Sequence, residues 1–328
     1  MNRRDFIVGS TGLLAAEALG RPAAARAQQQ NLPVIGLLDG VSGRLNSELG
    51  RGLRENGFLG GRDFNVEYGY RWPKLEADPM ARTAAEFVRR QVALIVAFSN
   101  KAASVAKAVT DTIPIIFLAD EPVAAGLVNS LERPRGHLTG ATGSVSDLTT
   151  ERIAILRQLV PTARTVVLVT DPTNKPAHDI ELREAQAAAS ALELQLSVIA
   201  WSGEHDLEPE LAALPGDRNT MLVFGAGYPF RVSPGLLAYL ATRYDMPAIH
   251  AVREAPDAGG LASFGTRLAD GGYLMGVYAA RVLKGDKPAD LPVRQITRTE
   301  FVINRGAAKS LGVQIPRTLI ARADDVID

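Results

Sequence analysis

Short runs of apolar residues alternate with longer stretches of helical periodicity along most of the chain. In the first cycle, strands are predicted at 33–38, 65–70, 93–98 and 113–118, with helices at 45–56, 79–90 and 102–110. These strands are apolar throughout instead of alternating, which is typical of a parallel sheet covered by helices on both faces. The pattern therefore predicts an α/β lobe.

The same cycle begins again in the second half of the chain. Strands are predicted at 165–170, 194–200, 220–225 and 247–252, with helices at 148–159, 177–192 and 234–244. Because the unit runs twice, we predict two doubly wound parallel-sheet lobes. The joint is expected near 136–145, which is rich in Gly, Thr and Ser without being of low complexity. Short hinge strands are therefore expected between the lobes instead of a flexible tether.

The last part of the chain departs from this order. A helix is predicted at 268–283, a β-rich segment at 293–304 and a final helix from residue 307. A chain that builds two lobes and then adds such elements is expected to cross back, with a second crossover at 260–265. The two lobes are therefore assigned to 33–143 plus about 266–295, and to 144–265 plus about 296–328.

The N-terminus has the features of an export signal. Arg3 and Arg4 precede a short apolar stretch at 7–19, and Ala25 and Ala27 place small residues where a signal peptidase requires them. The arginine pair followed by Asp, Phe and Ile resembles the twin-arginine export motif. The alternative is an amphipathic N-terminal helix of the folded domain.

An export signal would determine where the mature chain resides. We expect residues 1–27 to be removed by cleavage near Ala27/Gln28. The apolar stretch is too short to span a bilayer, so the mature protein is expected to be soluble and periplasmic.

Composition excludes several classes of protein. The 36 basic residues balance 36 acidic ones, so a global attraction to nucleic acid or to an anionic membrane is not indicated. The chain has no cysteine, which rules out disulfides, thiolate metal sites and a cysteine nucleophile. The four histidines lie far apart without metal-ligand spacing. No metal or cofactor is expected.

Candidate binding residues follow the predicted strands. Open parallel sheets bind ligands at the carboxyl ends of their strands, and two facing sheets form a cleft between lobes. Each strand end also precedes a helix, whose free N–H groups can bind a carboxylate. Hydroxyls, amides, carboxylates and aromatic rings dominate these positions. The candidate ligand-binding residues are Asp39, Ser42, Trp72, Ser99, Asn100, Asp120, Glu121, Thr170, Asp171, Ala226, Tyr228 and Phe264.

Each kind of candidate also has a purely structural interpretation. Ser42 and Ser99 could equally be helix caps, and the carboxylates could cap helices or stabilise turns. Trp72, Trp201 and Tyr228 could form an aromatic wall for stacking on a ligand, or they could pack in the core or the hinge. The sequence leaves both interpretations open.

Ordered motifs along the mature chain resemble those of one protein family. They are Gly52-Leu53, Gly57-Phe58, Val66-Glu67-Tyr68, Arg71-Trp72, Ile113-Pro114-Ile115-Ile116-Phe117, Pro122-Val123, Gly126-Leu127-Val128, Ser130-Leu131, Arg133-Pro134, Thr139-Gly140, Gly259-Gly260-Leu261, Leu283-Lys284-Gly285, Lys287-Pro288, Leu291-Pro292-Val293, Ile303-Asn304 and Leu311-Gly312. Each motif is weak alone, but the ordered set is specific. It resembles the ABC-transporter substrate-binding family related to tryptophan-type binding proteins.

This resemblance implies a type I periplasmic-binding fold and a receptor function. The expected partners are a small molecule, on which the two lobes close, and an ABC permease in the inner membrane; the receptor is expected to be monomeric. The family's ligand contacts, carried over, fall on Ser42, Ser99, Asn100, Thr170 and Tyr228.

The sequence departs from the family at two of these loops. Where the family has Asp-Pro-Val after the fourth strand, this chain has Glu121-Pro122-Val123, with Asp120 one place earlier. The loop after the third strand has Ser99-Asn100-Lys101 instead of Thr with small residues. Both changes alter the polarity of the expected pocket. A zwitterionic amino acid or a small carboxylate is the leading ligand class.

No enzyme signature is present. Residues 225–227 begin like a dinucleotide-binding loop, but Tyr228-Pro229-Phe230 replaces the remaining glycine pattern. Neither a phosphate-binding loop nor a nucleophile elbow occurs. Two other classes stay open, namely a ligand-sensing subunit for a membrane signalling receptor and an enzyme on the same scaffold. A ligand-sensing repressor is disfavoured, since no helix-turn-helix precedes the first strand.

Overall fold

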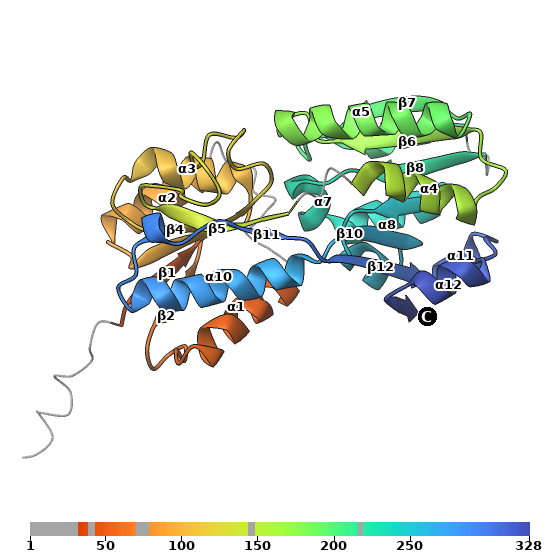
Figure 1. Cartoon of the computed structure of the whole chain (residues 1–328). Coiled ribbons are helices and arrows are strands. Elements are labelled where there is room, and N and C mark those ends of the chain that lie inside the picture. The colour runs from red at the N-terminus through yellow and green to blue at the C-terminus, as the bar shows by residue number, and fades with distance from the viewer. Residues whose placement is uncertain (1–31, 39–42, 70–78, 144–147, 216–218) are drawn as a thin grey trace, which may run out of the picture. The chain divides into compact units, whose positions relative to one another are not determined.

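The computed structural model describes residues 32–38, 43–69, 79–143, 148–215 and 219–328 (Figure 1). The predicted export signal lies outside these residues, as do three of the candidate site residues, Asp39, Ser42 and Trp72. The described chain forms two β-sheets, each covered by helices on both faces.

The first sheet has six strands in the order β11-β5-β4-β3-β1-β2, and every neighbouring pair is parallel. Its strands are β1 (Val34–Leu37), β2 (Asn65–Tyr68), β3 (Leu94–Ala97), β4 (Ile115–Ala119), β5 (Leu138–Gly143) and β11 (Arg294–Ile296). All residues of β3, β4 and β5 are buried, as the continuous apolar runs at the first two predicted.

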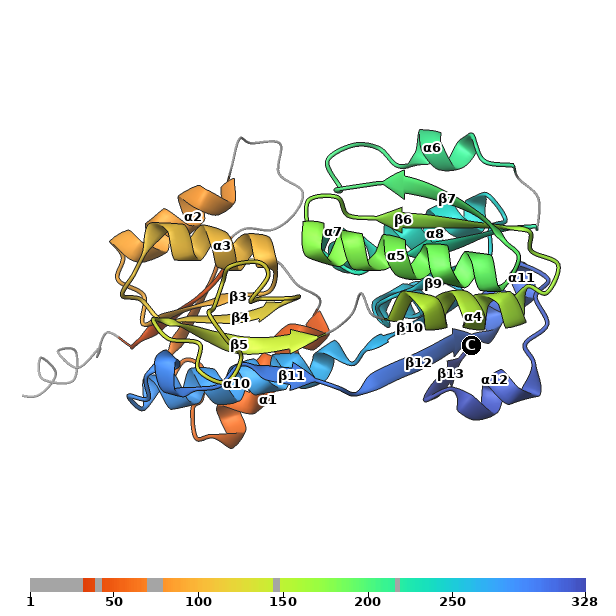
Figure 2. The same cartoon turned by 45° about the horizontal axis from the view of Figure 1, so that its top comes forward.

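Two pairs of helices cover this sheet. On one face lie α1 (Gly43–Glu55) and α10 (Leu268–Leu283), and on the other lie α2 (Pro79–Arg89) and α3 (Asn100–Val109) (Figure 2). The short 3-10 helix η2 (Pro288–Asp290) precedes β11. Each helix buries one apolar face against the sheet, which gives a separate core cluster on each side.

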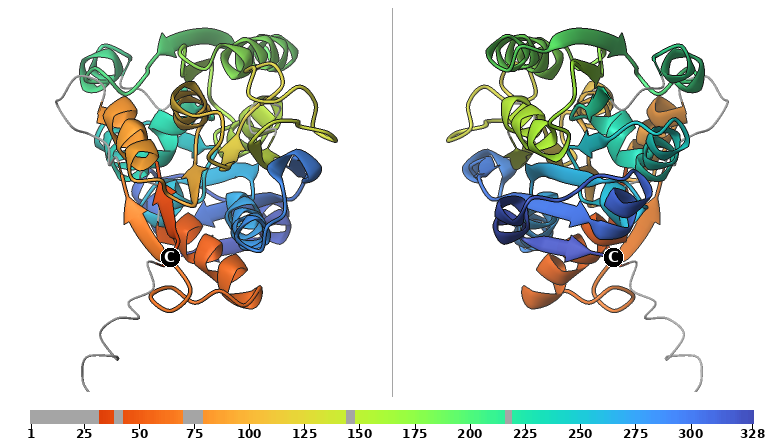
Figure 3. Two further views of the ribbon diagram at one scale, coloured as in Figure 1. Left: turned by 90° about the vertical axis from the view of Figure 1, so that its left-hand side faces the viewer. Right: turned by 90° about the vertical axis from the view of Figure 1, so that its right-hand side faces the viewer.

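Glycines bring α1 and α10 into close contact. A Cβ at Gly276 would clash with the carbonyl oxygen of Leu49, and a Cβ at Gly52 would clash with the carbonyl oxygen of Tyr273. Figure 3 shows the two helices side by side. This approach lets a helix from the C-terminal third of the chain complete the core of the first sheet.

The second sheet has seven strands in the order β13-β12-β10-β9-β8-β6-β7. They are β6 (Thr165–Thr170), β7 (Gln195–Ala200), β8 (Thr220–Phe224), β9 (Ala248–His250), β10 (Ala262–Thr266), β12 (Thr299–Asn304) and β13 (Asp325–Ile327). Only the β10–β12 pair is antiparallel among the described pairs.

Helices again cover both faces of the second sheet. One core cluster contains side chains of α4 (Thr149–Leu159), α5 (Lys175–Ala191), α11 (Arg305–Ser310) and α12 (Arg317–Arg322). The opposite cluster contains side chains of α6 (Glu208–Ala212), α7 (Tyr228–Val232) and α8 (Pro234–Arg243). The short α9 (Glu254–Asp257) lies between β9 and β10. The predicted fold class, two doubly wound lobes, is confirmed.

The chain passes between the sheets three times: after β5, after β10 and between β11 and β12. The expected second crossover at 260–265 is placed wrongly, because Ala262–Thr266 forms a buried strand paired with β9 and β12. The crossing begins at Arg267 instead. Part of the segment expected to join the lobes first, Leu138–Gly143, is likewise a strand of the first sheet.

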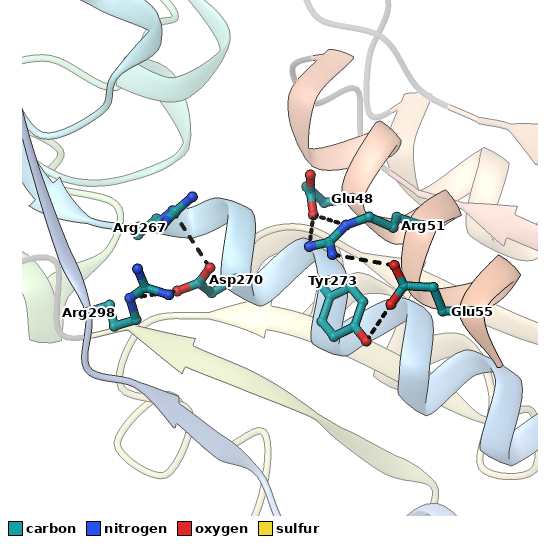
Figure 4. A network of polar contacts seen from close by, with 7 residues as sticks. All are labelled: Glu48, Arg51, Glu55, Arg267, Asp270, Tyr273 and Arg298. Atoms are coloured by element: carbon teal, nitrogen blue, oxygen red, sulfur yellow. Dashed lines mark hydrogen bonds and ion pairs between the residues drawn. The ribbon is translucent and has the colours of Figure 1, made fainter. Parts of the chain in front are cut away.

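The second and third crossings are bound to each other. The backbone N–H of Arg267 donates to the carbonyl oxygen of Arg298 at 2.8 Å. Asp270 lies 3.7 Å from the Nε of Arg267 and 3.8 Å from the Nε of Arg298 (Figure 4). These ion pairs are partly exposed, so each contributes little alone, but the backbone hydrogen bond ties the two connections together.

Candidate functional site

Two candidate residues that follow strands of the first sheet are hydrogen-bonded to each other. The side-chain amide of Asn100 donates to the carbonyl oxygen of Asp120 at 2.6 Å, and its Oδ1 accepts from the N–H of Asp120 at 2.8 Å. Asn100 therefore fixes the loop after β4 from the start of α3. Ser99 accepts from the N–H of Ala102 at 3.1 Å and is the N-cap of α3, so its capping interpretation is confirmed.

Asp120 carries a buried carboxylate at this strand end. Its residue is only 5% exposed. Within the described part of the chain, no donor lies within hydrogen-bond distance of the carboxylate oxygens. Burial raises the pKa of the Asp120 carboxyl, Arg231 opposes that shift and Glu121 adds to it. Glu121 itself has a φ of 45°, an unusual backbone conformation for a non-glycine residue. A cationic group beside Asp120 would offset the cost of burying its charge.

Arg231 lies near Asp120 and was missed by the sequence analysis. It belongs to α7, which follows β8, and it is 8% exposed. Its Nη2 donates to the carbonyl oxygen of Phe98, directly after β3, at 2.6 Å. Its Nε is buried without a hydrogen-bond partner in the described chain. A basic residue in a short helix that begins Tyr-Pro-Phe gave no signal for this role.

In the second sheet, Asp171 follows β6 and stabilises a turn. Its Oδ1 accepts from the backbone N–H of Thr173 at 2.9 Å and from the hydroxyl of the same residue at 2.7 Å. Its Oδ2 faces Gly227, where a Cβ would lie 3.5 Å away. Gly227 has a φ of 135°, which favours glycine. Asp171 thus stabilises a turn through one carboxylate oxygen and directs the other at the loop after β8.

Thr170 and Ala226 meet at a residue that the sequence analysis missed. Glu181 of α5 accepts from the hydroxyl of Thr170 through Oε2 and from the N–H of Ala226 through Oε1, each at 2.5 Å. Its Oε1 lies 3.9 Å from Nη2 of Arg152. Burial raises the pKa of Glu181 to about 7, with Arg152, the N–H of Ala226 and the hydroxyl of Thr170 acting against the shift.

A signal for Glu181 was present in the sequence. Ala177, Glu181, Ala185 and Ala188 lie on one face of α5 and are all buried. A single carboxylate in a stripe of small apolar residues at helical spacing marks a buried charge. Gly225 also belongs to this arrangement, since a Cβ there would clash with Oε2 of Glu181.

The aromatic candidates lie in different environments. Trp201 is buried, donates from Nε1 to the carbonyl oxygen of His205 at 2.9 Å and packs 5.7 Å from Phe230, so its core interpretation is confirmed. Phe264 belongs to a core cluster, with its ring edge-on to Phe301 at 6.2 Å. Tyr228 is the half-buried first residue of α7. Ligand contact by Phe264 or Tyr228 stays a prediction.

The described residues contain no group of three or more His, Cys, Asp or Glu side chains placed to hold a metal ion. Within the same described ranges, none of the helices has the length and apolar character to cross a bilayer.

Solved structures share the fold of this chain. The crystal structure of an ABC domain in complex with L-Trp from Streptococcus pneumoniae covers 90% of this chain and 100% of its own, with a TM-score of 0.77 and 21% identity. A ligand-free, open substrate binding protein with adhesive properties from Clostridium difficile covers 90% and 99%, with a TM-score of 0.61 and 23% identity. At these identities the likeness shows the fold, which is that of type I periplasmic-binding proteins.

A family model matches most of the chain. Residues 44–327 match the family model described as ABC transporter substrate binding protein, and the chain belongs to this family of solute-binding proteins. A curated relative, the tyrosine-binding protein of Clostridioides difficile, is 26% identical over 266 residues, which are 80% of this chain and 75% of the relative. The resemblance identified from the sequence motifs is confirmed.

Proposed function

We propose that this chain is an exported receptor that captures an amino acid between its two lobes and delivers it to an ABC importer. Its family and the names of its relatives support this proposal: one is called tyrosine-binding, and another was solved in complex with L-Trp. In this proposal the predicted signal, residues 1–27, directs export to the periplasm, and the mature chain acts as a monomer.

The observation that carries the ligand class is the buried Asp120 carboxylate. It lacks a hydrogen-bond donor in the described chain, and Arg231 is the nearby positive charge. An α-amino acid has an ammonium group for such a carboxylate and a carboxylate for a guanidinium or for helix N–H groups. The proposed site comprises Asp120, Arg231, Asp171 and Tyr228, together with the other strand-end candidates.

Capture requires relative movement of the lobes. We assign the moving bodies to 33–143 plus about 266–295 and to 144–265 plus about 296–328, the boundaries expected from the sequence. The three crossings at their junction are short and suited to hinge bending. Ligand binding to one lobe would then be completed by the other, and the permease would recognise the closed form.

The proposal is tested with the mature chain beginning at Gln28. Thermal-shift and calorimetric titrations would use L-Tyr and L-Trp, with N-acetyl-L-Tyr and tyramine as matched probes that lack the ammonium or the carboxylate. Binding of an L-amino acid with loss of binding by both analogues is the expected result. Mass spectrometry of copurified small molecules extends the test to other amino acids. If none of the twenty standard amino acids shifts the unfolding temperature or copurifies, the ligand class is wrong.

A further inference from the structure

One buried side chain connects the two second-sheet loops of the proposed site. The carboxylate of Glu181 accepts from the Thr170 hydroxyl at the end of β6 and from the Ala226 N–H after β8. These bonds join the loop that contains Asp171 to the loop that leads into α7. Since Arg231 and Tyr228 both lie on α7, the position of Glu181 affects where the second sheet presents its polar groups.

Glu181 is enclosed by charged and titratable groups from several elements. The residue is 1% exposed, and Arg152 of α4, which lies 3.9 Å away, is fully buried. Arg152 also donates to the hydroxyl of Thr149 at 2.8 Å and to the carbonyl oxygen of Phe264 at 3.4 Å. Burying an ionised pair is costly unless its remaining hydrogen bonds are made, and Glu181 makes its hydrogen bonds to Thr170 and Ala226 in the proposed binding loops.

Three further groups face this cluster. His178, also on α5, has its Nδ1 3.2 Å from the Thr170 hydroxyl. Glu184 accepts from the N–H groups of Thr149 and Thr150 at the start of α4 and lies close enough to influence Arg152 electrostatically. Asp120, from the first sheet, acts on Glu181 as a like charge. The charge on Glu181 is therefore coupled electrostatically to Asp120, a residue of the proposed ligand site.

We propose that Glu181 is a positioning residue of the ligand site, and that it makes ligand affinity depend on pH by changing its bonds to Thr170 and Ala226. This inference rests on the proposed function. The ionised carboxylate accepts from both donors at once. When protonated, one oxygen must donate instead, and the Thr170 hydroxyl can accept that proton and turn its own hydrogen toward His178.

Protonation should weaken the site. The bond from the Ala226 N–H loses its charge assistance, and charge-assisted hydrogen bonds are roughly twice as strong as neutral ones. The loop that leads into α7 is then held less firmly. Because burial raises the pKa of Glu181 to about 7, the change falls within the neutral range.

The affinity experiment uses whichever of L-Tyr and L-Trp binds the mature chain. The dissociation constant should rise about threefold to tenfold between pH 8 and pH 6, as expected for losing one charge-assisted bond. The Glu181→Gln variant should bind with the weaker affinity at both values. Asp179→Asn removes the same charge from an exposed position on the same helix and should keep the wild-type pH dependence. A Glu181→Gln variant with unchanged pH dependence would overturn the inference.

His178 needs its own control, because its Nδ1 lies 3.2 Å from the same Thr170 hydroxyl. The His178→Gln variant should retain most of the pH dependence. If the pH dependence disappears in His178→Gln and persists in Glu181→Gln, the titrating group is the histidine and the inference fails.

A measurement without ligand separates this inference from the proposed function. The amide proton of Ala226, followed by NMR in the ligand-free wild-type protein, should titrate with a midpoint near neutrality. The matched amide of Leu222, inside β8 and bonded to the carbonyl oxygen of Pro247, should not. Titration at Ala226 without amino-acid binding would refute the proposed ligand and leave the proton coupling intact. A flat Ala226 profile alongside ligand binding would refute the coupling alone.

Discussion

The guanidinium of Arg231 donates to the carbonyl oxygen of Phe98 at 2.6 Å, although 133 positions separate the two residues. Arg231 follows a strand of the second sheet and Phe98 follows a strand of the first. A single side chain therefore joins strand ends of both sheets, next to the buried Asp120 carboxylate. Replacing Arg231 should therefore weaken ligand binding mainly in the state in which both lobes contact the ligand.

Replacing Arg231 with Met should weaken amino-acid binding by about tenfold or more, because hydrogen bonds to charged groups contribute about 1.5–3 kcal/mol. Calorimetric titration measures the effect. Arg243→Met is the matched control: this arginine is half exposed on α8 and pairs with Glu208. Equal affinities of the wild type and Arg231→Met would show that the contact with Phe98 does not support binding.

Asp120→Asn should abolish most of the affinity for a ligand with an ammonium group. Truncating one partner of a buried charge pair costs about 2–5 kcal/mol, which corresponds to a loss of roughly 30-fold or more. The exposed Asp111→Asn is the control in the same lobe.

The same Asp120→Asn variant should unfold at a higher temperature than the wild type when no ligand is present. Burial raises the pKa of Asp120 above its unfolded value. The free energy of unfolding of the wild type therefore decreases as the pH rises through the folded pKa of this carboxyl. Thermal unfolding at neutral pH measures this effect. If the Asp120→Asn variant binds the amino acid with wild-type affinity, Asp120 does not belong to the ligand site.

Gly276→Ala should destabilise the protein by about 1–3 kcal/mol, the usual cost of overpacking. The new methyl group would clash with the carbonyl oxygen of Leu49, which belongs to the backbone of α1 and cannot easily move. Gly50→Ala, on the same helix as Leu49 with open space around its Cβ position, should instead stabilise by about 0.5–1 kcal/mol. Denaturant unfolding compares the two. A harmless Gly276→Ala would contradict the close packing of α1 on α10.

His250 should make the protein sensitive to acid. Its ring stacks 4.6 Å from Phe224, and burial lowers its pKa to about 3. The folded pKa lies below the unfolded value of about 6.5. The contribution of His250 to the free energy of unfolding is therefore fully present above about pH 6.5 and falls as the pH decreases toward 3. At pH 5 the loss from this group amounts to about 2 kcal/mol.

The His250→Leu variant should lack this component of acid sensitivity. The exposed His205→Leu variant serves as the control and should follow the wild-type profile. Urea unfolding at about pH 7 and pH 5 measures the difference. If His250→Leu loses as much stability as the wild type between these values, other groups cause the acid sensitivity.

Most strands could be predicted from the sequence because they are continuous apolar runs, whereas β10 was mistaken for a crossover. Its sequence contains Gly265, where a Cβ would clash with the carbonyl oxygen of Ala251 in the adjoining segment. Gly140 of β5 meets the carbonyl oxygen of Phe117 in the same way. Glycines that allow close backbone approach resemble hinge glycines when only the sequence is known.

The proposed site was only partly predictable for a related reason. Strand ends mark the loops, so Asn100, Asp120 and Asp171 could be singled out before the structure was known. Glu181 and Arg231 reach the same region from helices. The spacing of small residues in α5 marks Glu181 as buried, but the partners of Glu181 and Arg231 depend on how the helices pack over the sheet, about which a single side chain within a helix carries little information.

The seam between α1 and α10 has a consequence for the order of folding. Gly52 contacts a helix whose residues follow it by more than two hundred positions, so one face of the first sheet is covered by α1 alone while the intervening chain leaves the ribosome. Domains generally fold as units during synthesis. Here the first sheet stays incomplete until α10 and β11 have been synthesised, after most strands of the second sheet, and truncation ahead of residue 283 should leave an aggregation-prone fragment.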